Sequence, residues 1–270
     1  MGTKRLLLGA LKRHGQRRLP LSSLIAAAAR AYLDGYENND YDMARNGEVG
    51  LLRRLAPLRP RLVFDVGANR GEWSRAALEA FPEAALHAFE IAPPTAAALA
   101  GFLGAHPRCT ILPYGLGEAE GRIALEFRPG LDVLTTRLLD AGIHAAPAER
   151  IEGRIRRGDA HCAEYGIDAI DLLKIDVEGG EPEVLDGFGA MLAEGRIGVI
   201  QFEYGMANIT SRVLLRDFHA RLGAAGYEVG KLYPHGVAFA PWRPEAEDFR
   251  GPNHVAVHRS RPDWRAALAA

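Results

Sequence analysis

The sequence predicts an α/β fold with a seven-stranded, mostly parallel sheet, helices on both faces and an N-terminal helical arm. Three observations predict this fold. From Arg61 onward, short apolar strands alternate with amphipathic helices, which is the pattern of βαβ units. The first strand leads directly into a glycine-containing loop and a helix, as nucleotide-binding α/β domains do. The content of 48% hydrophobic and 25% charged residues is that of a globular domain.

Seven segments have the length and apolar character of strands. An antiparallel strand is expected to enter the sheet at the last strand pair. The seven segments are residues 62–66, 85–90, 109–113, 171–177, 197–203, 227–233 and 254–258.

Helices are expected before and between these strands. Apolar residues recur at helical spacing over residues 24–33, where Ser22 or Ser23 can cap the helix and Gly35 can end it. The polar segment 34–47 is expected to be a loop that could cover a ligand site. Further helices are expected at Glu48–Leu55, at 72–81, at 182–192 and around Leu214, Phe218 and Leu222.

The chain divides into an arm and loop, residues 1–45, and a main domain, residues 46–270. Basic residues break the apolar run of the arm, so neither a signal peptide nor a transmembrane segment is expected. A solvated helix face is the ordinary interpretation of this basic segment. The alternatives are contact with an anionic membrane surface and pairing of subunits in a homo-oligomer.

The segment 121–157 departs from the alternation of strands and helices. Its residues 122–127 alternate as a strand does, whereas residues 129–157 have no clear period. Long insertions in compact domains commonly form lids or binding loops. We therefore expect this insertion to carry substrate specificity.

Composition excludes several classes of protein. The formal net charge is −1 and no dense basic tract is present, so a nucleic-acid partner is not expected. The two cysteines, Cys109 and Cys162, form neither a disulfide framework nor a zinc spacing. A soluble protein of the reducing cytoplasm is the expectation.

The loop after the first strand has the spacing Gly-Ala-Asn-x-Gly. Small residues allow a backbone to approach a nucleotide-like ligand, where a Cβ would collide with the cofactor. The third small residue of a dinucleotide fold is replaced by Glu72, which favours S-adenosylmethionine over NAD. The candidate cofactor contacts of this segment are Asp65, Gly67, Ala68, Asn69 and Gly71.

Carboxylates end three of the expected strands. Glu90 ends the second, where a carboxylate can accept both ribose hydroxyls of an adenosine. Asp176 and Glu178 end the fourth and Glu203 ends the next, beside the crevice where α/β sheets bind ligands, so Asp176 is also a candidate cofactor contact. An acid at the end of a buried strand is costly to desolvate without a partner, so a functional role is favoured. Glu181 is expected only to favour the start of the following helix.

Other residues receive a structural interpretation. Trp73 and Phe102 are expected to pack in the core. The histidines, among them His161, lack the spacing of a helical metal site and are interpreted as surface or packing residues. Gly115 either flanks an adenine or simply makes a turn, and His235 lies in a loop that could touch substrate.

Taken together, residues 63–71, Phe89-Glu90, the Lys174-Ile175-Asp176-Val177-Glu178-Gly179 block and Glu203 resemble the FkbM family of methyltransferases over about residues 62–205. The resemblance implies a Rossmann-like class I methyltransferase fold and S-adenosylmethionine-dependent methylation of a hydroxyl on a sugar, glycan or natural-product small molecule. Two departures are Gly180, where the family often has alanine, and Gly158-Asp159 in place of its Thr-Leu-Asp.

Methylation of an aliphatic hydroxyl needs alignment and removal of a proton. Asp176, Glu178 and Glu203 are the candidate catalytic residues. Either one of them is a general base, which we favour, or Asp176 and Glu203 help to hold Mg²⁺. An NAD(P)-dependent oxidoreductase and a methyltransferase-like binding domain without turnover are the rival functions. Against the oxidoreductase, the sequence lacks the third glycine of a dinucleotide-binding loop and a clear catalytic Tyr/Lys or His pair.

Overall fold

The computed structural model describes residues 2–14, 20–127 and 149–270. Within these residues, the main sheet has eight strands in the order β10-β9-β11-β8-β7-β1-β2-β3. Parallel pairs join β3, β2, β1, β7 and β8, and β11 is antiparallel to both β8 and β9. The strands are β1 (Leu62–Val66), β2 (Ala85–Phe89), β3 (Cys109–Leu112), β7 (Ile170–Ile175), β8 (Ile197–Glu203), β9 (Tyr227–Tyr233), β10 (Gly236–Phe239) and β11 (Asn253–His258).

All seven expected strands are present, and the antiparallel strand enters where it was expected. The number seven was wrong, because β10 forms a hairpin with β9 at the edge of the sheet. This strand has four residues, too few to give a clear alternation in the sequence.

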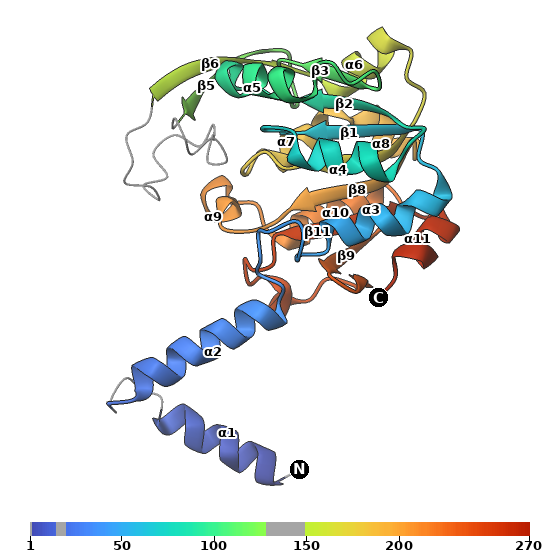
Figure 1. The fold of residues 1–270 in the computed structure, drawn as a ribbon. Helices are drawn as coiled ribbons and strands as arrows, with labels where there is room; N and C mark the ends of the chain where they lie inside the picture. The colour runs from blue at the N-terminus through green and yellow to red at the C-terminus, as the bar shows by residue number, and fades with distance from the viewer. Residues whose placement is uncertain (1, 15–19, 128–148) are drawn as a thin grey trace.

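Helices cover both faces of the sheet (Figure 1). Alternate residues of each strand point to opposite faces: Phe64 and Leu173 belong to one apolar cluster, and Val63 and Leu172 belong to the other. The first cluster contains side chains of α6 (Gly158–Tyr165), α7 (Glu181–Gly187), α8 (Gly189–Ala193) and α10 (Leu215–Ala224). The second contains side chains of α3 (Glu48–Leu55), α4 (Glu72–Ala80), α5 (Pro93–Leu103) and α11 (Pro262–Leu268).

Two helical predictions need correction. The helix expected over 182–192 is two short helices, α7 and α8, separated at Phe188. Asp159 accepts hydrogen bonds from the backbone N–H groups of Ala190 and Met191, which supports a separate start for α8. Phe102 was expected in the core but is 51% exposed.

The N-terminal arm consists of α1 (Gly2–His14) and α2 (Ser22–Tyr36), which project away from the sheet (Figure 1). No residue of α2 is buried. The expected serine cap is absent, because Leu21 is the N-cap residue and makes no side-chain cap hydrogen bond. The helix also continues through Gly35 to Tyr36 instead of ending at the glycine.

Residues 37–47, here called the strap, connect α2 to α3. The side-chain amide of Asn38 donates to the carbonyl oxygens of Asn46 and Leu232, at 2.7 and 2.9 Å. Lys231 of β9 pairs with Glu37 at 2.7 Å. The strap is therefore fastened to the edge of the sheet at β9.

The insertion forms a second sheet with β4 (Gly115–Leu116), β5 (Gly121–Phe127) and β6 (Glu149–Arg156) in the order β4-β6-β5. The strand expected at 122–127 is confirmed, whereas β6 was not predicted. Residues 128–148 of the insertion lie outside the described residues. A Cβ on Gly153 or Gly115 would lie 2.5 or 2.9 Å from side-chain atoms of Ile91. The insertion thus packs directly on the residue that follows Glu90.

Candidate active site

The predicted site residues gather at one edge of the sheet. Strands β1, β2, β7 and β8 are mutually parallel through their neighbours, so their carboxyl ends lie at the same edge. The glycine loop follows β1, Glu90 follows β2, Asp176 follows β7 and Glu203 is the last residue of β8. This is the edge at which open α/β sheets bind their ligands.

The glycine loop is held against β2 and β7. The backbone N–H groups of Gly67 and Ala68 both donate to the carbonyl oxygen of Phe89, at 3.0 and 2.9 Å. Gly67 has φ +83°, and a Cβ there would lie 1.8 Å from the carbonyl oxygen of Asp176. A side chain at this position would therefore collide with the backbone just after β7, apart from any contact with a cofactor.

A Gly67→Ala variant should lose about 2–4 kcal/mol of stability, because alanine adds backbone strain and a contact that the backbone must move to relieve. Gly101→Ala is the matched control. Gly101 lies inside α5 with nothing within 4 Å of a Cβ, so that variant should gain about 0.5–1 kcal/mol. Urea denaturation of both variants measures the difference. Equal stabilities would contradict the close contact between the loop and β7.

Glu90 ties the glycine loop to the end of β2. One carboxylate oxygen accepts the N–H of Asn69 at 2.9 Å, and the other accepts the N–H of Ala92 at 2.8 Å. Burial raises the pKa of Glu90 to about 7, against the effect of these two bonds. Each oxygen has a second acceptor position, so the carboxylate can accept two further hydroxyl groups.

Asp65 lies in β1, one residue before the strand ends at this edge. Its side chain is fully buried, and its two oxygens contact the Ser74 hydroxyl at 2.6 Å and the Lys174 ammonium at 3.3 Å. Lys174 also pairs with Asp176 at 3.1 Å. Asp65 and Asp176 are thus joined through one buried cation.

Lys174 was not predicted as a site residue. Burial alone would lower its pKa, but the carboxylates of Asp176, Asp65 and Glu48 outweigh burial and raise it. The ammonium group therefore remains charged and partly neutralises the acids above it. A lysine in the middle of the apolar run of β7 was the signal in the sequence, because a buried lysine needs acidic partners.

Asp176, Glu178 and Glu203 form an acidic cluster in which one ligand oxygen of each lies within 4.8 Å of the others. Burial, followed by the negative charge of Asp176, raises the pKa of Glu178 to about 8 and that of Glu203 well above its ordinary value. The structure therefore brings together all three acids predicted as catalytic.

Glu181 does more than was expected of it. Its carboxylate is buried and accepts the backbone N–H groups of Val177 and Gly179, at 3.1 and 3.2 Å. It therefore holds the loop that carries Glu178, which has a positive φ of 55°.

Tyr41 of the strap is a site residue that the sequence prediction missed. Its hydroxyl oxygen lies 3.4 Å from the position of a Cβ on Gly205, two residues after Glu203. Burial and the charges of Glu203, Glu178 and Asp176 raise the pKa of Tyr41 to about 12, although the residue as a whole is 62% exposed. The strap therefore borders the acidic cluster.

Next to Tyr41, the short helix α9 (Ala207–Ser211) carries exposed apolar side chains. Met206, just before the helix, and Ile209 within it are both more than half exposed. A ligand with both a polar and an apolar portion could contact the carboxylates and this apolar surface at the same place.

The other candidate residues lie around this edge. Gly115 packs against Ile91 and lies in the short strand β4, so it makes a close contact and not the expected turn. His235 stacks on Tyr233, with ring centroids 5.5 Å apart.

Below the second strand, two histidines and a tyrosine form a buried hydrogen-bonded chain. His87 Nδ1 lies 3.0 Å from His161 Nε2, and the Tyr114 hydroxyl lies 2.9 Å from His161 Nδ1. Burial lowers the pKa of both histidines to about 4, and for His161 the neighbouring His87 contributes. The packing interpretation of His161 agrees with this position, and His87 was not singled out in the sequence.

This histidine pair predicts acid sensitivity. Because the folded pKa lies below the ordinary value of 6.5, the unfolded chain binds more protons between about pH 6.5 and pH 4. The stability is complete above pH 6.5 and falls as the pH drops, by about 2–3 kcal/mol for each histidine at pH 4. His161→Gln should therefore reduce the slope of unfolding free energy against pH over this range.

The control is His235→Gln, since His235 is exposed, and its slope should match that of the unchanged chain. Carboxylates with a raised pKa change the slope of unfolding free energy against pH in the opposite direction. They are present in the unchanged chain and in both variants, so the difference between the slopes reports the histidine pair alone. Imidazole resonances give a second readout. Titration of every histidine near pH 6.5 would refute the prediction.

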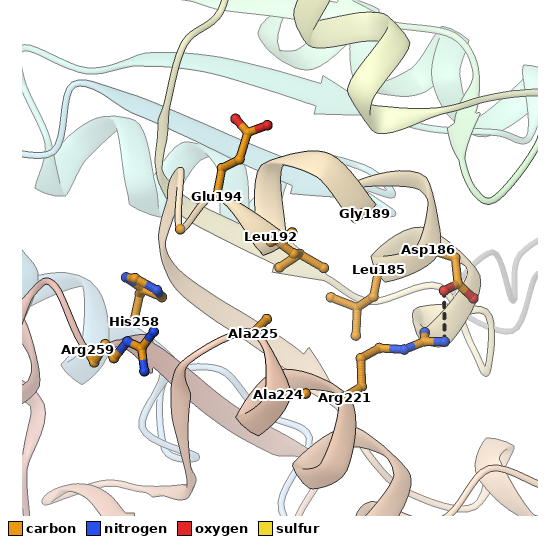
Figure 2. A pocket seen from close by; sticks show the side chains of 12 residues that line it. Leu185, Asp186, Gly189, Leu192, Glu194, Arg221, Ala224, Ala225, His258 and Arg259 are labelled. Atoms are coloured by element: carbon orange, nitrogen blue, oxygen red, sulfur yellow. Dashed lines mark ion pairs between the residues drawn. The ribbon is translucent and has the colours of Figure 1, made fainter.

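A separate hollow of about 490 Å³ lies on another part of the molecule (Figure 2). It is lined by residues before β8, such as Gly195, and after β11, such as Arg259. Arg221 pairs with Asp186 across it at 2.8 Å. Because β8 starts here, the hollow lies at the edge opposite the acidic cluster and contains none of the predicted residues.

The strand order, the inserted antiparallel strand and the acids at the carboxyl edge define a class I methyltransferase fold. The sequence profile described as the methyltransferase FkbM domain matches residues 65–229, more than half of the chain. The chain belongs to this family.

Two relatives show the same similarity. The 2-O-methyltransferase NoeI of Sinorhizobium fredii is 30% identical over 55% of this chain and 64% of its own length. The 31-O-demethyl-FK506 methyltransferase FkbM of Streptomyces tacrolimicus is 34% identical over 50% of this chain and 63% of its own. The chain thus matches less than two thirds of either relative.

Among solved structures, the methyltransferase FkbM from Methylobacillus flagellatus aligns with a TM-score of 0.46 and 17% identity. The alignment covers 73% of this chain and 43% of that one. Among the described residues, no helix is long and apolar enough to cross a membrane.

Proposed function

We propose that this protein is an S-adenosylmethionine-dependent O-methyltransferase whose acceptor is a hydroxyl group of a glycan or other small molecule. The observation that carries the proposal is the pairing of Glu90 beside the glycine loop with the acidic cluster at the ends of β7 and β8. Family membership supports methyl transfer, and the names of both relatives specify an oxygen acceptor.

The residues fit the proposed cofactor. Glu90 uses one acceptor position of each oxygen for a backbone N–H, which leaves a second position on each for the two hydroxyls of a ribose. Gly67, Ala68, Asn69 and Gly71 would lie along the cofactor, and Gly115 would border its adenine. Asp65 would act indirectly, through Lys174 and Asp176.

S-adenosylmethionine would supply a methyl group on a positively charged sulfur. The acidic cluster would then accept the proton of the acceptor hydroxyl as its oxygen attacks that methyl group. Glu203 lies beside Asp176 in the acidic cluster, and Lys174 stabilises the charge of Asp176 from below. We assign Glu203, with Asp176, as the group that takes the proton, and Tyr41 as a wall of the acceptor site.

A second mechanism rests on the chemistry of the same donors. Three carboxylates within 4.8 Å suit a hard divalent cation. Asp176 and Glu203 would hold Mg²⁺, which would lower the pKa of the acceptor hydroxyl. We favour the mechanism without metal because Lys174 already supplies a positive charge to Asp176.

Glu203→Gln should lower the rate of methyl transfer about 100-fold or more, as removal of a general base does, and leave S-adenosylhomocysteine binding unchanged. The measurement is conversion of labelled S-adenosylmethionine with a mixture of hydroxylated acceptors. Glu194→Gln, an exposed acid at the opposite edge, is the control. Loss of transfer in a chelator with recovery in Mg²⁺ would replace the base mechanism with the cation mechanism.

The function itself is tested by calorimetric titration of the purified protein with S-adenosylhomocysteine and, separately, with NAD⁺. Binding of S-adenosylhomocysteine alone supports the proposal. Binding of NAD⁺ alone would overturn it in favour of an oxidoreductase. Binding of S-adenosylhomocysteine without transfer to any acceptor would favour the binding domain without turnover.

A further inference from the structure

The N-terminal arm carries apolar side chains that nothing else in the described structure covers. Both helices expose them, and their exposed fractions range from 39% to 70%. On α2 they recur at spacings of three and four residues, which makes one apolar stripe. The exposed residues are Leu6, Leu8, Leu11, Leu21, Leu24, Ile25, Tyr32, Leu33 and Tyr36.

The arm is strongly basic. Residues 1–36 contain seven lysines and arginines and one acid, Asp34 near the end of α2. Because the net charge of the whole chain is −1, the rest of the chain is net negative. The basic residues of the arm are Lys4, Arg5, Lys12, Arg13, Arg17, Arg18 and Arg30.

The arm is connected directly to the candidate active site. The chain passes from α2 into the strap, and Tyr41 of the strap borders the acidic cluster at Gly205. Glu37 and Asn38 fasten the strap to β9 immediately after α2 ends. Figure 1 shows α2 leaving the body below this region. A surface bound by the arm would therefore lie near the edge of the sheet that receives the acceptor.

We propose that the arm binds an anionic lipid surface, with its apolar side chains in the interface and its basic side chains on the headgroups. Helices with one apolar face and basic polar residues bind membranes in this way, and each Lys or Arg near an anionic surface adds to the attraction. Where the proposed function holds, the arm places the acceptor site at the membrane, so that the acceptor class is a hydroxyl of a lipid-linked molecule such as a lipid-linked glycan.

Charge favours the lipid surface over a second copy of the chain. Two arms packed against each other would bring together two strongly basic segments, which repel each other. An anionic membrane supplies the opposite charge over a wide area and accepts apolar residues in the same plane. The tyrosines of α2, Tyr32 and Tyr36, are also of the type that concentrates at the membrane interface.

The test is sedimentation of the full chain with two kinds of vesicle, phosphatidylcholine alone and an equal mixture of phosphatidylcholine and phosphatidylglycerol. We expect binding to the anionic vesicles at about 0.1 M salt and release at about 0.5 M salt. Lys12→Gln with Arg13→Gln should weaken binding about tenfold or more, and Leu24→Ser with Ile25→Ser should weaken it as well. Arg53→Gln with Arg243→Gln removes the same charge from exposed sites on the body and should have little effect.

Three outcomes would overturn the proposal. These are no binding to anionic vesicles, equal binding to both kinds of vesicle, and a dimer in size-exclusion chromatography that the Leu24→Ser and Ile25→Ser pair dissociates without any vesicle binding. Calorimetry with S-adenosylhomocysteine on the same variants keeps the two proposals separate. Vesicle binding by a chain that does not bind S-adenosylhomocysteine would support the arm and refute the enzyme.

Discussion

Replacing Lys174 by methionine is expected to lower the free energy of unfolding by about 3–5 kcal/mol, the usual cost of removing one partner from a buried ion pair. The ammonium group lies between Asp65 and Asp176, at 3.3 and 3.1 Å. Asp65 is fully buried, so its charge would lose its only cationic partner among the described residues and could not gain water in exchange. The variant is therefore expected to be less stable than the unchanged chain.

Urea denaturation at pH 7 measures this loss. Lys12→Met, on the exposed face of α1, is the matched control and should change stability by less than about 0.5 kcal/mol. The double variant Asp65→Asn, Lys174→Met should recover part of the loss, because a neutral amide costs less to bury than a carboxylate. A loss below about 1 kcal/mol in the single variant would mean that Lys174 is not a structural cation.

Replacing Glu90 by alanine is expected to weaken S-adenosylhomocysteine binding about 100-fold or more. Two hydrogen bonds from ribose hydroxyls to a charged group would be lost, and each such bond contributes about 1.5–3 kcal/mol. The N–H groups of Asn69 and Ala92 would also lose their acceptor, which loosens the glycine loop.

Calorimetric titration gives the affinity, and a thermal melt of each variant shows whether it is folded. Glu79→Ala is the control, because Glu79 is exposed and pairs with Arg75 on the surface of the adjacent helix α4. Glu90→Gln should fall between the two, since its amide can accept one of the two N–H groups but repels the other. Affinity within threefold of the unchanged chain in Glu90→Ala would remove the ribose assignment.

The strands and the acids at their ends could be predicted from the sequence because each depends on the pattern of neighbouring residues. Each of the seven predicted strands has its own apolar run, and acids at the ends of parallel strands must meet at one edge. Asp176, Glu178 and Glu203 could be grouped for that reason. Asp65 could be placed at the right strand, but its contact with Lys174 could not, because it depends on the register between β1 and β7.

The parts that were missed depend on packing between distant segments. Tyr41 reaches the acidic cluster only because the strap is fastened to β9, almost 200 residues away in the chain. His87 meets His161 only when α6 packs on the sheet. Phe102 is exposed because the core-facing side of α5 is occupied by Leu99 and Leu103.

The strap also determines how many N-terminal residues can be removed without loss of contacts to the main domain. A chain that starts at Glu37 retains the bonds of Asn38 to Leu232 and of Glu37 to Lys231, as well as Tyr41 at the acidic cluster. A chain that starts at Glu48 gives up all of them and frees the buried Glu48 carboxylate from its Asn46 partner. Residues 1–36 contact the main domain through Asp34, which pairs with Arg250 at 3.6 Å, whereas the eleven residues after them are held to β9 and to the candidate active site.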